Sequence, residues 1–338
     1  MSNQPPIEVP QGAIRLNTDS QKLEFYAQDR WYEMATDSPI LGNATNSPDA
    51  SGGARGVIAG NNPTSNVIQY FTIPVQGNAI DFGDLSQNRF VGGSGSSRTR
   101  GIFMGGDPGP SGRLDDIDFI TIAATGNAQD FGDLTVARAH GCGTSNQTRC
   151  CMMGGSASSG NQSHIDHITT ASTGNAKDFG DLIEATEHAA GASSPTRGMV
   201  AGGNPGTANR IQFITITTLG DAQDFGDLQA LGDTMMGGGM ASPIRAIFAG
   251  NYTNKIESVT IASKGNSQEF GTMTTSRGCP HSNTDSVRGI ISGGYTPGST
   301  NTMEYIYIMT EGSGVDFGDL VADTANGFDT VSTAHGGL

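Results

Sequence analysis

Short apolar segments recur along nearly the whole chain, separated by glycine-rich and polar segments. In six places an arginine precedes a brief apolar run that ends at glycine followed by glycine or asparagine; "RGVIAGN" and "RGIFMGG" are examples. Apolar runs of this length, bounded by glycine, predict β-strands because buried helices are longer. No window of the sequence shows the 3.6-residue period of an amphipathic helix, so the pattern predicts an all-β protein.

Three further segments accompany each of these runs. After an insert of variable length comes a segment such as "IQFITITT", in which apolar and polar positions largely alternate, as expected of a half-buried strand. A Thr-Gly-Asn or Gly-Asp sequence then supplies a hairpin turn, and "DFGDL" follows on the last strand. A tract of small residues, such as "AHGCGTS", leads to the next arginine and suits an innermost strand, where strands crowd around an axis.

The segment "DFGDL" occurs in six copies, one of them degenerate, whose phenylalanines lie 45 to 49 residues apart. A single copy would suggest the metal-binding Asp of protein kinases, but a catalytic Asp is needed once, so six copies favour a structural role. The period and the four short strands indicate a six-bladed β-propeller with four-stranded blades. Blade one lacks an innermost strand, so we expect the C-terminal "VADTANGFDTVSTAHGGL" to supply it and close the ring. A seventh blade is the alternative if residues 12–50 form one.

The first forty residues differ from the repeats. "GAIRLNTDSQKLEFYAQDRWYEM" predicts three short strands joined by turns, and it holds the only Trp of the chain. A meander of about 25 residues buries too little surface to fold alone, so it should dock on a partner or on copies of itself. We therefore predict an anchor at residues 1–40, a linker at 41–54 and the propeller at 55–338. The expected anchor residues are Leu16, Phe25, Tyr26 and Trp31.

Charge and cysteine content narrow the range of functions. The formal net charge of −15 would repel a nucleic-acid backbone or an anionic membrane, so we expect neither as a partner. The four cysteines show no framework spacing and are expected to be free thiols. The first residues lack the basic start and apolar core of a secretory signal, and no apolar run of 18 residues occurs, so neither an export signal nor membrane insertion is expected.

Two sets of oppositely charged residues recur once per blade. We expect them to form a repeated ion pair or a clamp on the backbone, within or between blades. Calcium binding by pairs such as Asp130 and Asp133 is disfavoured, because a strand offers few of the six to eight oxygens that calcium needs. The basic set is Arg55, Arg100, Arg149, Arg197, Arg245 and Arg288, and the acidic set is Asp81, Asp130, Asp178, Asp224, Glu269 and Asp316.

Histidines are the weak candidates for binding. His140 and His188 each stand nine residues after a repeat phenylalanine, and His281 is close to an equivalent position, so we expect all three at the mouth of the central channel. They are either polar rim residues or a cluster that binds a metal or an anionic ligand. His164 and His167 should face opposite sides of a strand, which argues against a shared metal. No nucleophile elbow, phosphate-binding loop or zinc-ligand spacing occurs, so we predict no catalytic residue, no metal and no cofactor.

Two resemblances bear on function. The four-strand unit with Gly-Gly after its second strand resembles the kelch repeat over roughly residues 50–338, although "DFGDL" stands where that repeat has Tyr and Trp. "GAIRLNTDSQKLEFYAQDRWYEM" resembles a short segment of structural proteins from tailed bacteriophages, and the "DFGDL" repeats ending in "AHGGL" resemble propeller-like repeats of virion proteins from marine phages, cyanophages especially. The resemblance implies a non-enzymatic virion protein made in the host cytoplasm. Its anchor would bind other virion proteins or form a homo-oligomer, and its propeller would decorate the particle or bind a host-surface glycan or protein.

Two alternatives stay open. An enzyme that degrades surface glycans would concentrate acidic residues at one rim position of a few blades, whereas the acidic residues are spread evenly through the "DFGDL" copies. A cellular kelch-like interaction module would occur outside virions and never within them.

Overall fold

The computed structural model describes residues 10, 12–17, 22–27, 30–33, 54–61, 64–90, 92–110, 112–204, 209–231, 237–295, 298–324 and 329–338. The chain divides into two compact units, Met1–Ala50 and Ser51–Leu338. The expected linker at 41–54 lies outside the described residues except for Ala54. In the described part of the chain, no helix is long and apolar enough to cross a membrane.

The first unit contains one antiparallel sheet. It consists of β1 (Ile14–Asn17), β2 (Lys22–Ala27) and β3 (Arg30–Glu33), in that order. The guanidinium of Arg15 pairs with Glu24 at 2.7 Å and lies 4.1 Å above the ring of Trp31, which also meets Tyr26 edge to face. These contacts hold the two outer strands against β2.

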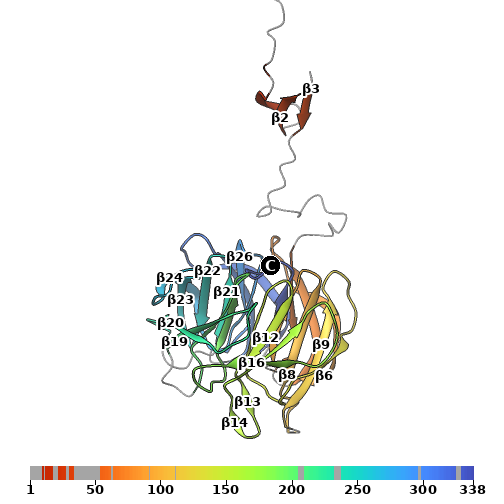
Figure 1. Ribbon diagram of the computed structural model, residues 1–338, viewed down its shortest axis with the longest axis vertical. Coiled ribbons are helices and arrows are strands. Elements are labelled where there is room, and N and C mark those ends of the chain that lie inside the picture. The colour runs from red at the N-terminus through yellow and green to blue at the C-terminus, as the bar shows by residue number, and fades with distance from the viewer. Residues whose placement is uncertain are drawn as a thin grey trace, which may run out of the picture. The chain divides into compact units, whose positions relative to one another are not determined.

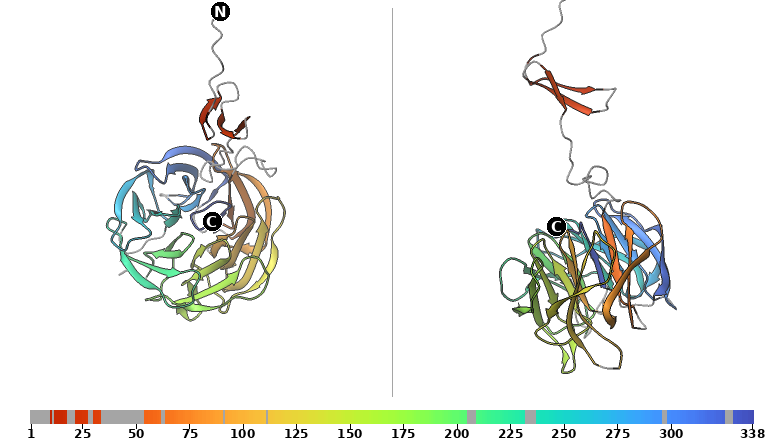
Figure 2. Two further views of the ribbon diagram at one scale, coloured as in Figure 1. Left: turned by 45° about the horizontal axis from the view of Figure 1, so that its top comes forward. Right: turned by 90° about the vertical axis from the view of Figure 1, so that its right-hand side faces the viewer.

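The second unit is a six-bladed β-propeller whose blades are four-stranded antiparallel sheets (Figures 1 and 2). From the inner strand outward, blade 1 contains β29 (Asp329–Ser332), β4 (Arg55–Ala59), β5 (Ser65–Thr72) and β6 (Ile80–Arg89); blade 2 contains β7 (Gly93–Ser96), β8 (Arg100–Gly106), β9 (Leu114–Thr121) and β10 (Gln129–Asp133); and blade 3 contains β11 (Cys142–Ser145), β12 (Arg149–Met153), β15 (His164–Thr169) and β16 (Lys177–Asp181).

The other three blades repeat this order. Blade 4 contains β17 (Ala190–Ser193), β18 (Arg197–Ala201), β19 (Arg210–Thr215) and β20 (Gln223–Asp227); blade 5 contains β21 (Gly237–Ala241), β22 (Arg245–Gly250), β23 (Thr253–Thr260) and β24 (Gln268–Arg277); and blade 6 contains β25 (His281–Thr284), β26 (Arg288–Ser292), β27 (Thr300–Tyr307) and β28 (Val315–Thr324). A short hairpin, β13 (Ser156–Ala157) and β14 (Gly160–Asn161), forms the insert of blade 3.

The ring closes as the sequence predicts. β29 pairs with β4, with Ser332 opposite Gly56, so the C-terminal segment completes blade 1. Each inner strand contacts its two neighbours around the axis, including β29 with β7 and with β25. Six blades are therefore confirmed, and the seven-blade alternative is wrong because the described strands of residues 12–33 form their own sheet.

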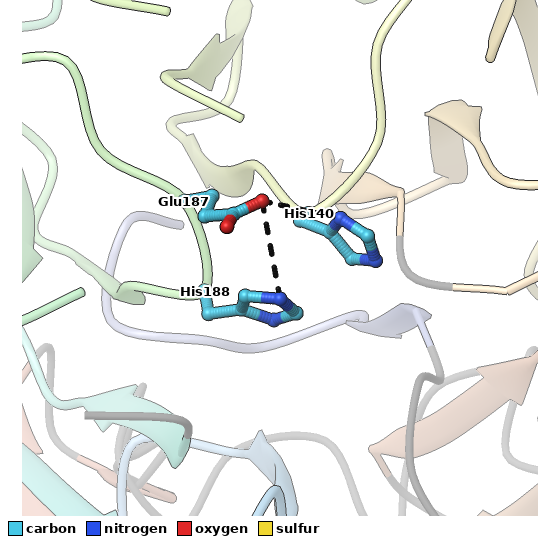
Figure 3. Close-up of side chains that lie close together, drawn as sticks. All are labelled: His140, Glu187 and His188. Carbon is cyan, nitrogen blue, oxygen red and sulfur yellow. Dashed lines mark ion pairs between the residues drawn. The ribbon is translucent and has the colours of Figure 1, made fainter. Parts of the chain in front are cut away.

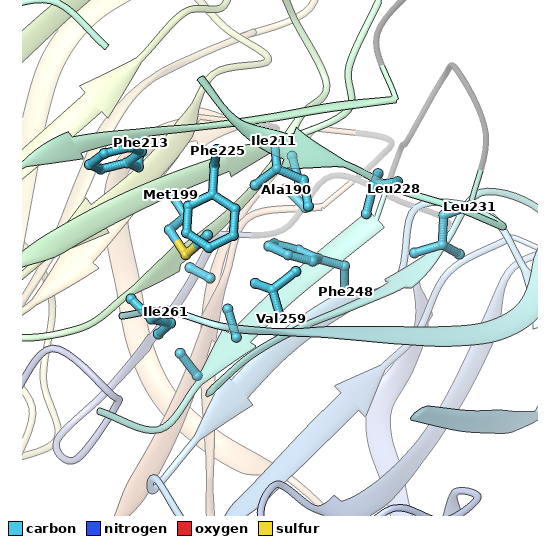
Figure 4. Packing of buried hydrophobic residues seen from close by; sticks show 14 residues of the cluster. Ala190, Met199, Ile211, Phe213, Phe225, Leu228, Leu231, Phe248, Val259 and Ile261 are labelled. Carbon is cyan, nitrogen blue, oxygen red and sulfur yellow. The ribbon is translucent and has the colours of Figure 1, made fainter. Parts of the chain in front are cut away.

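Hydrophobic residues fill the spaces between neighbouring blades. Between blades 4 and 5, for example, Met199 and Phe225 pack with Phe248, Val259 and other buried side chains (Figure 4). The phenylalanine of every "DFGDL" copy is 2–3% exposed, because alternation along the outer strand directs it inward while the flanking acids face solvent.

The "DFGDL" segment also forms hydrogen bonds that join each blade to the next. In blade 2, the carbonyl oxygens of Phe131 and Asp133 accept hydrogen bonds from the amides of Gly174 and Ala176 in the outer turn of blade 3, both at 2.7 Å. The amide of Asp133 in return donates to Asn175 Oδ1 at 3.2 Å. The same exchange recurs around the ring and includes the closing contact of Gly77 with Phe317. The repeated "GNA" turn is therefore the partner of the preceding "DFGDL".

The degenerate fifth copy fits the same scheme. Its Thr272 stands where the other copies have Asp, and the next turn reads Gly-Ser-Gly, so the Thr272 and Ser313 hydroxyls pair at 2.9 Å in place of the amide–asparagine bond. Glycine is required at the centre of the motif because Gly132 has φ +144° and a Cβ there would lie 2.6 Å from the backbone carbon of Gly174.

The repeated arginines clamp backbone carbonyls of the next blade. Each one begins the second strand of its blade, lies 4.5–5.8 Å above an aromatic ring of that blade, and donates to a carbonyl oxygen of the following blade. The donor and acceptor residues are Arg55 with Ile122, Arg100 with Thr170, Arg149 with Ile216, Arg197 with Ile261, Arg245 with Ile308, and Arg288 with Ile73 and Pro74.

The repeated arginines do not form the alternative arrangement that we expected, an ion pair with the first acid of each "DFGDL" copy. Among the described residues, none of these six arginines pairs with the first acid of "DFGDL", and the six acids are exposed. The reason is geometric: the arginine lies beside an aromatic ring and faces the neighbouring blade, whereas the acid lies on the solvent side of the outer strand. Within the described part of the chain, two of the six acids have a basic partner on the adjacent strand: Asp224 pairs with Arg210 and Glu269 with Lys255.

Three blade interfaces contain buried ion pairs that the sequence did not reveal. Arg89 pairs with Asp118, Arg138 with Asp166, and Arg277 with Glu304, and all six side chains are at most 2% exposed. Each acid also accepts the backbone amide that follows the "DFGDL" copy of the preceding blade. Where Thr186 replaces the arginine, the acid is replaced by Gln212, which still accepts the amide of Ile183. At each of these four interfaces, the buried arginine and the buried acid are therefore either both present or both replaced by neutral residues.

Candidate functional site

The propeller has two different faces. Because strands alternate in direction, the turns between first and second strands and between third and fourth strands share one face, which we call the turn face. The inserts between second and third strands and the linkers between blades share the other, the insert face. Figure 1 shows β13 and β14 protruding from the insert face, opposite the C-terminus.

The central channel is narrow because its inner strands are rich in glycine and serine. A Cβ on Gly191 would lie 2.5 Å from the carbonyl oxygen of Gly143 on the neighbouring strand. Hydroxyl groups link the strands near the turn face: Ser145 Oγ accepts from the Ser96 amide at 2.9 Å, and Ser96 Oγ donates to the Ser332 carbonyl at 2.7 Å. Serine hydroxyls thus provide hydrogen-bond partners for backbone amides and carbonyls of neighbouring inner strands. Larger side chains would push these strands apart.

The C-terminal tail covers the turn-face end of this channel. His335 Nε2 lies 3.1 Å from both Ser145 Oγ and the carbonyl oxygen of Ser96, and Ser286 Oγ donates to the carbonyl of Ala334 at 2.8 Å. Gly336 is buried against backbone carbonyls of blades 4 and 5. Figure 2 shows the C-terminus in the middle of the ring. Burial lowers the pKa of His335 to about 4, so its imidazole is neutral at pH 7.

A cavity of about 200 Å³ occupies the channel. Its described lining is mostly glycine, serine and small apolar residues of the inner strands, with Asp329 as the single carboxylate. Burial raises the pKa of Asp329 to about 7, although Arg89 and the amide of Gly92 favour its ionised form. Among its described lining residues, the cavity therefore has one carboxylate, whereas glycoside hydrolases generally use a pair.

The mouth of the channel on the insert face brings His140, Glu187 and His188 together. His140 lies in the linker between β10 and β11, and the other two lie in the linker between β16 and β17. Bridges of Ala139 with Ser156 and of Glu187 with Asn204 hold these linkers against the inserts. The amide of His188 donates to the carbonyl of His140 at 2.7 Å, which joins the two linkers directly.

The carboxylate of Glu187 faces both imidazole rings (Figure 3). Its Oε2 lies 3.5 Å from His140 Nδ1 and 4.0 Å from His188 Nε2, and the ring centroids are 4.2 Å apart. Asn204 Nδ2 donates to the other oxygen, Oε1, at 3.2 Å. His140 Nδ1 is buried and has no hydrogen-bond partner among the described residues. The three side chains are 12–22% exposed, so the cluster is largely enclosed but reachable.

The environment keeps both imidazoles neutral at pH 7. Burial lowers the pKa of His140 to about 3, with further contributions from His188 and the guanidinium of Arg113. Burial also lowers the pKa of His188, and Glu187 opposes this effect. Neutral imidazoles have free lone pairs, which makes them competent ligands for a metal ion.

The structure brings two of the three candidate histidines, His140 and His188, into one cluster. His281 is not part of the cluster: it begins β25, and Cys279 occupies the position equivalent to His140 and His188, as its φ of +51° beside their +59° shows. Sequence reasoning missed Glu187 because this linker position varies from blade to blade: it is Phe90, Ala139 and Gly278 in three other linkers and Asp233 in a fourth. The available signal was an acid directly before a rim histidine, which occurs at Glu187-His188.

None of the four cysteines forms a disulfide, as expected; Cys142, Cys150 and Cys151 are buried and Cys279 is partly exposed. His164 and His167 stay apart from the cluster: His164 lies 3.3 Å from Asp181, and the ring of His167 packs against Phe179.

No model of a known protein family matches the chain, and no curated protein matches it either.

Proposed function

We propose that the protein is a structural protein of a tailed-phage virion, anchored by residues 1–40 and displaying the propeller to decorate the particle or bind the host surface. The observation that carries this proposal is the division of the chain at residue 50 into a small three-stranded sheet and a self-contained ring. The sheet includes the segment that resembles phage structural proteins, and it contains too few residues for a stable core of its own.

The propeller suits display outside a particle for two physical reasons. β29 closes the ring by completing blade 1, and backbone hydrogen bonds, arginine–carbonyl bonds and buried ion pairs join neighbouring blades. Few sheet edges are therefore free to pair with other molecules and aggregate. The chain enters it at Ala54 on the turn face, which the C-terminal tail also covers. The insert face lies opposite this entry and carries the variable loops, the usual location of ligand contacts. A host-surface glycan or protein is the expected ligand of that face.

Deletion of residues 1–40 tests the anchor. Purified particles from cells that express the truncated protein should lack it, whereas full-length protein should be incorporated. Circular dichroism of the truncated protein should show the same β-sheet spectrum and melting temperature for the propeller. Normal incorporation of the truncated, folded protein would refute the proposal.

Competition tests the displayed propeller. The folded truncated protein should reduce adsorption of phage to host cells in proportion to its concentration, and deletion of residues 157–160 in the blade 3 insert should weaken the effect more than substitution of the turn-face residue Arg98→Ala. Release of reducing sugars from host polysaccharide by the purified protein would favour the enzyme instead. Detection of the protein in cells but never in purified particles would favour the cellular interaction module.

A further inference from the structure

The rim cluster has the spacing of a metal site rather than of an ordinary polar surface. The candidate ligand atoms of His140, Glu187 and His188 all lie within 4.8 Å of one another. Bonds of about 2.0–2.2 Å in tetrahedral geometry place zinc ligands about 3.3 Å apart. The separation of 3.5 Å between His140 Nδ1 and Glu187 Oε2 is already close to this value, and His188 Nε2 needs to approach Glu187 by less than 1 Å from 4.0 Å.

The backbone brings the ligands together at a conformational cost. His140 and His188 both have φ +59°, a region that residues other than glycine seldom adopt, although histidine tolerates it better than most. The hydrogen bond from the His188 amide to the His140 carbonyl fixes the two strained residues side by side. Backbone strain of this kind concentrates at functional sites, and here it places two imidazoles over one carboxylate.

The surroundings supply an outer shell for the carboxylate. Asn204 donates a hydrogen bond to Oε1 of Glu187 and leaves Oε2 directed at the histidines, and in known metal sites such hydrogen bonds orient the ligating carboxylate. His140 Nδ1 is buried, lies 3.5 Å from Glu187 Oε2 and has no hydrogen-bond partner among the described residues, so it can turn a lone pair toward an ion. Arg113, the cation near both rings, forms an ion pair with Asp107, which compensates its charge. A net charge of −15 on the whole chain attracts cations to its surface.

We propose that His140, Glu187 and His188 form a binding site for a divalent transition-metal ion, with zinc as the best fit, at the insert-face mouth of the channel. Two imidazoles and one carboxylate are the donor set that zinc and its neighbours in the series prefer, whereas calcium and magnesium require more oxygens. The fourth position stays open to water or to an oxygen of an external ligand. The ion would join the linkers that precede blades 3 and 4.

Zinc binding to the full chain tests the proposal. The protein is treated with a chelator, dialysed, and titrated with Zn²⁺ alone by isothermal titration calorimetry, and one ion per chain is expected. His140→Asn and His188→Asn remove an imidazole while keeping a side chain that tolerates positive φ, and Glu187→Gln keeps the shape of the side chain. Each should weaken zinc binding by at least about tenfold. His164→Asn, which removes an imidazole next to the carboxylate of Asp181 elsewhere, is the matched control and should bind as the wild type does.

Two further readouts separate this site from the cysteines and from misfolding. The Co²⁺ complex should show the visible bands of tetrahedral coordination without a thiolate-to-cobalt charge-transfer band, and the circular dichroism spectra of the variants should match the wild type. The proposal is overturned by the absence of zinc binding, by a thiolate band, or by variants that stay folded and bind zinc as tightly as the wild type.

Discussion

Asp166→Asn probes the charge matching at the buried blade interfaces. In the wild type, Arg138 Nη1 lies 2.8 Å from Asp166 Oδ2, and the two side chains are 0% and 2% exposed. The guanidinium also donates to the carbonyls of Gly154 at 2.9 Å and Met152 at 3.3 Å, so it cannot swing out to solvent without breaking those bonds. The substitution therefore leaves a buried cation without its anion.

The expected cost is large because the charge stays buried. Removal of one partner of a buried ion pair destabilises proteins by about 3–5 kcal/mol, whereas replacement of both partners by neutral residues of similar volume is often close to neutral. The double variant Arg138→Met/Asp166→Asn should thus be more stable than Asp166→Asn alone by at least about 1 kcal/mol, despite the loss of the arginine hydrogen bonds. The neutral Thr186 and Gln212 at the next interface show that the fold accepts an uncharged version.

Urea denaturation followed by far-ultraviolet circular dichroism measures these differences. Tryptophan fluorescence is unsuitable because the only Trp, Trp31, lies outside the propeller. Asp178→Asn is the control: Asp178 is an exposed "DFGDL" acid without an ion pair among the described residues, and its loss should cost less than about 0.5 kcal/mol. The reasoning fails if Asp166→Asn costs no more than Asp178→Asn, or if the double variant is less stable than Asp166→Asn.

Three further predictions concern the "DFGDL" segment, the channel and the tail. Gly132→Ala should destabilise the propeller by about 2 kcal/mol or more, because Gly132 has a positive φ and the added Cβ would clash with the backbone of Gly174. Gly126→Ala is the control and should cost less, because φ there is +152° but nothing lies within 4 Å of the added Cβ. Equal melting temperatures of the two variants would contradict this prediction. Asp329 has a pKa of about 7, above its unfolded value, so its native state binds the extra proton and the wild type loses stability as pH rises from about 4 to 7. Asp329→Asn should therefore match the wild type near pH 4 and exceed it at pH 8 by up to about 4 kcal/mol, and a stability difference that does not change with pH would disprove the burial effect. Deletion of Ala334–Leu338 should open the channel and lower the melting temperature slightly. Deletion of Asp329–Leu338 also removes β29 and should prevent cooperative unfolding. Similar melting curves for the two truncated proteins would show that β29 does not close the ring.

Much of the candidate site was within reach of the sequence, and the part that was not has a clear cause. The repeat period places His140 and His188 at equivalent positions of adjacent blades, so their common location at the rim follows from counting along the chain. His281 also lines the central cavity but stays outside the cluster, because Cys279, two residues earlier, occupies the backbone position equivalent to His140 and His188. Glu187 is adjacent to His188 in the sequence, but its approach to His140 depends on which linkers meet around the axis, and no local pattern contains that information.

The sequence by itself determined the all-β class, the six blades, the four strands of each and the closing role of the C-terminus. These features depend on the period of apolar residues, on glycine at turns and on crowding at an axis, and each of these is local or is repeated often enough to be counted. Only the tertiary structure decided the partners of the charged residues. Arginines that could have paired with the "DFGDL" acids instead bind backbone carbonyls of the next blade. A separate set, Arg89, Arg138 and Arg277, pairs with the buried acids Asp118, Asp166 and Glu304. The direction of a side chain across a blade interface is set by the packing of two sheets, so residues far apart in the sequence must be in place before it is determined.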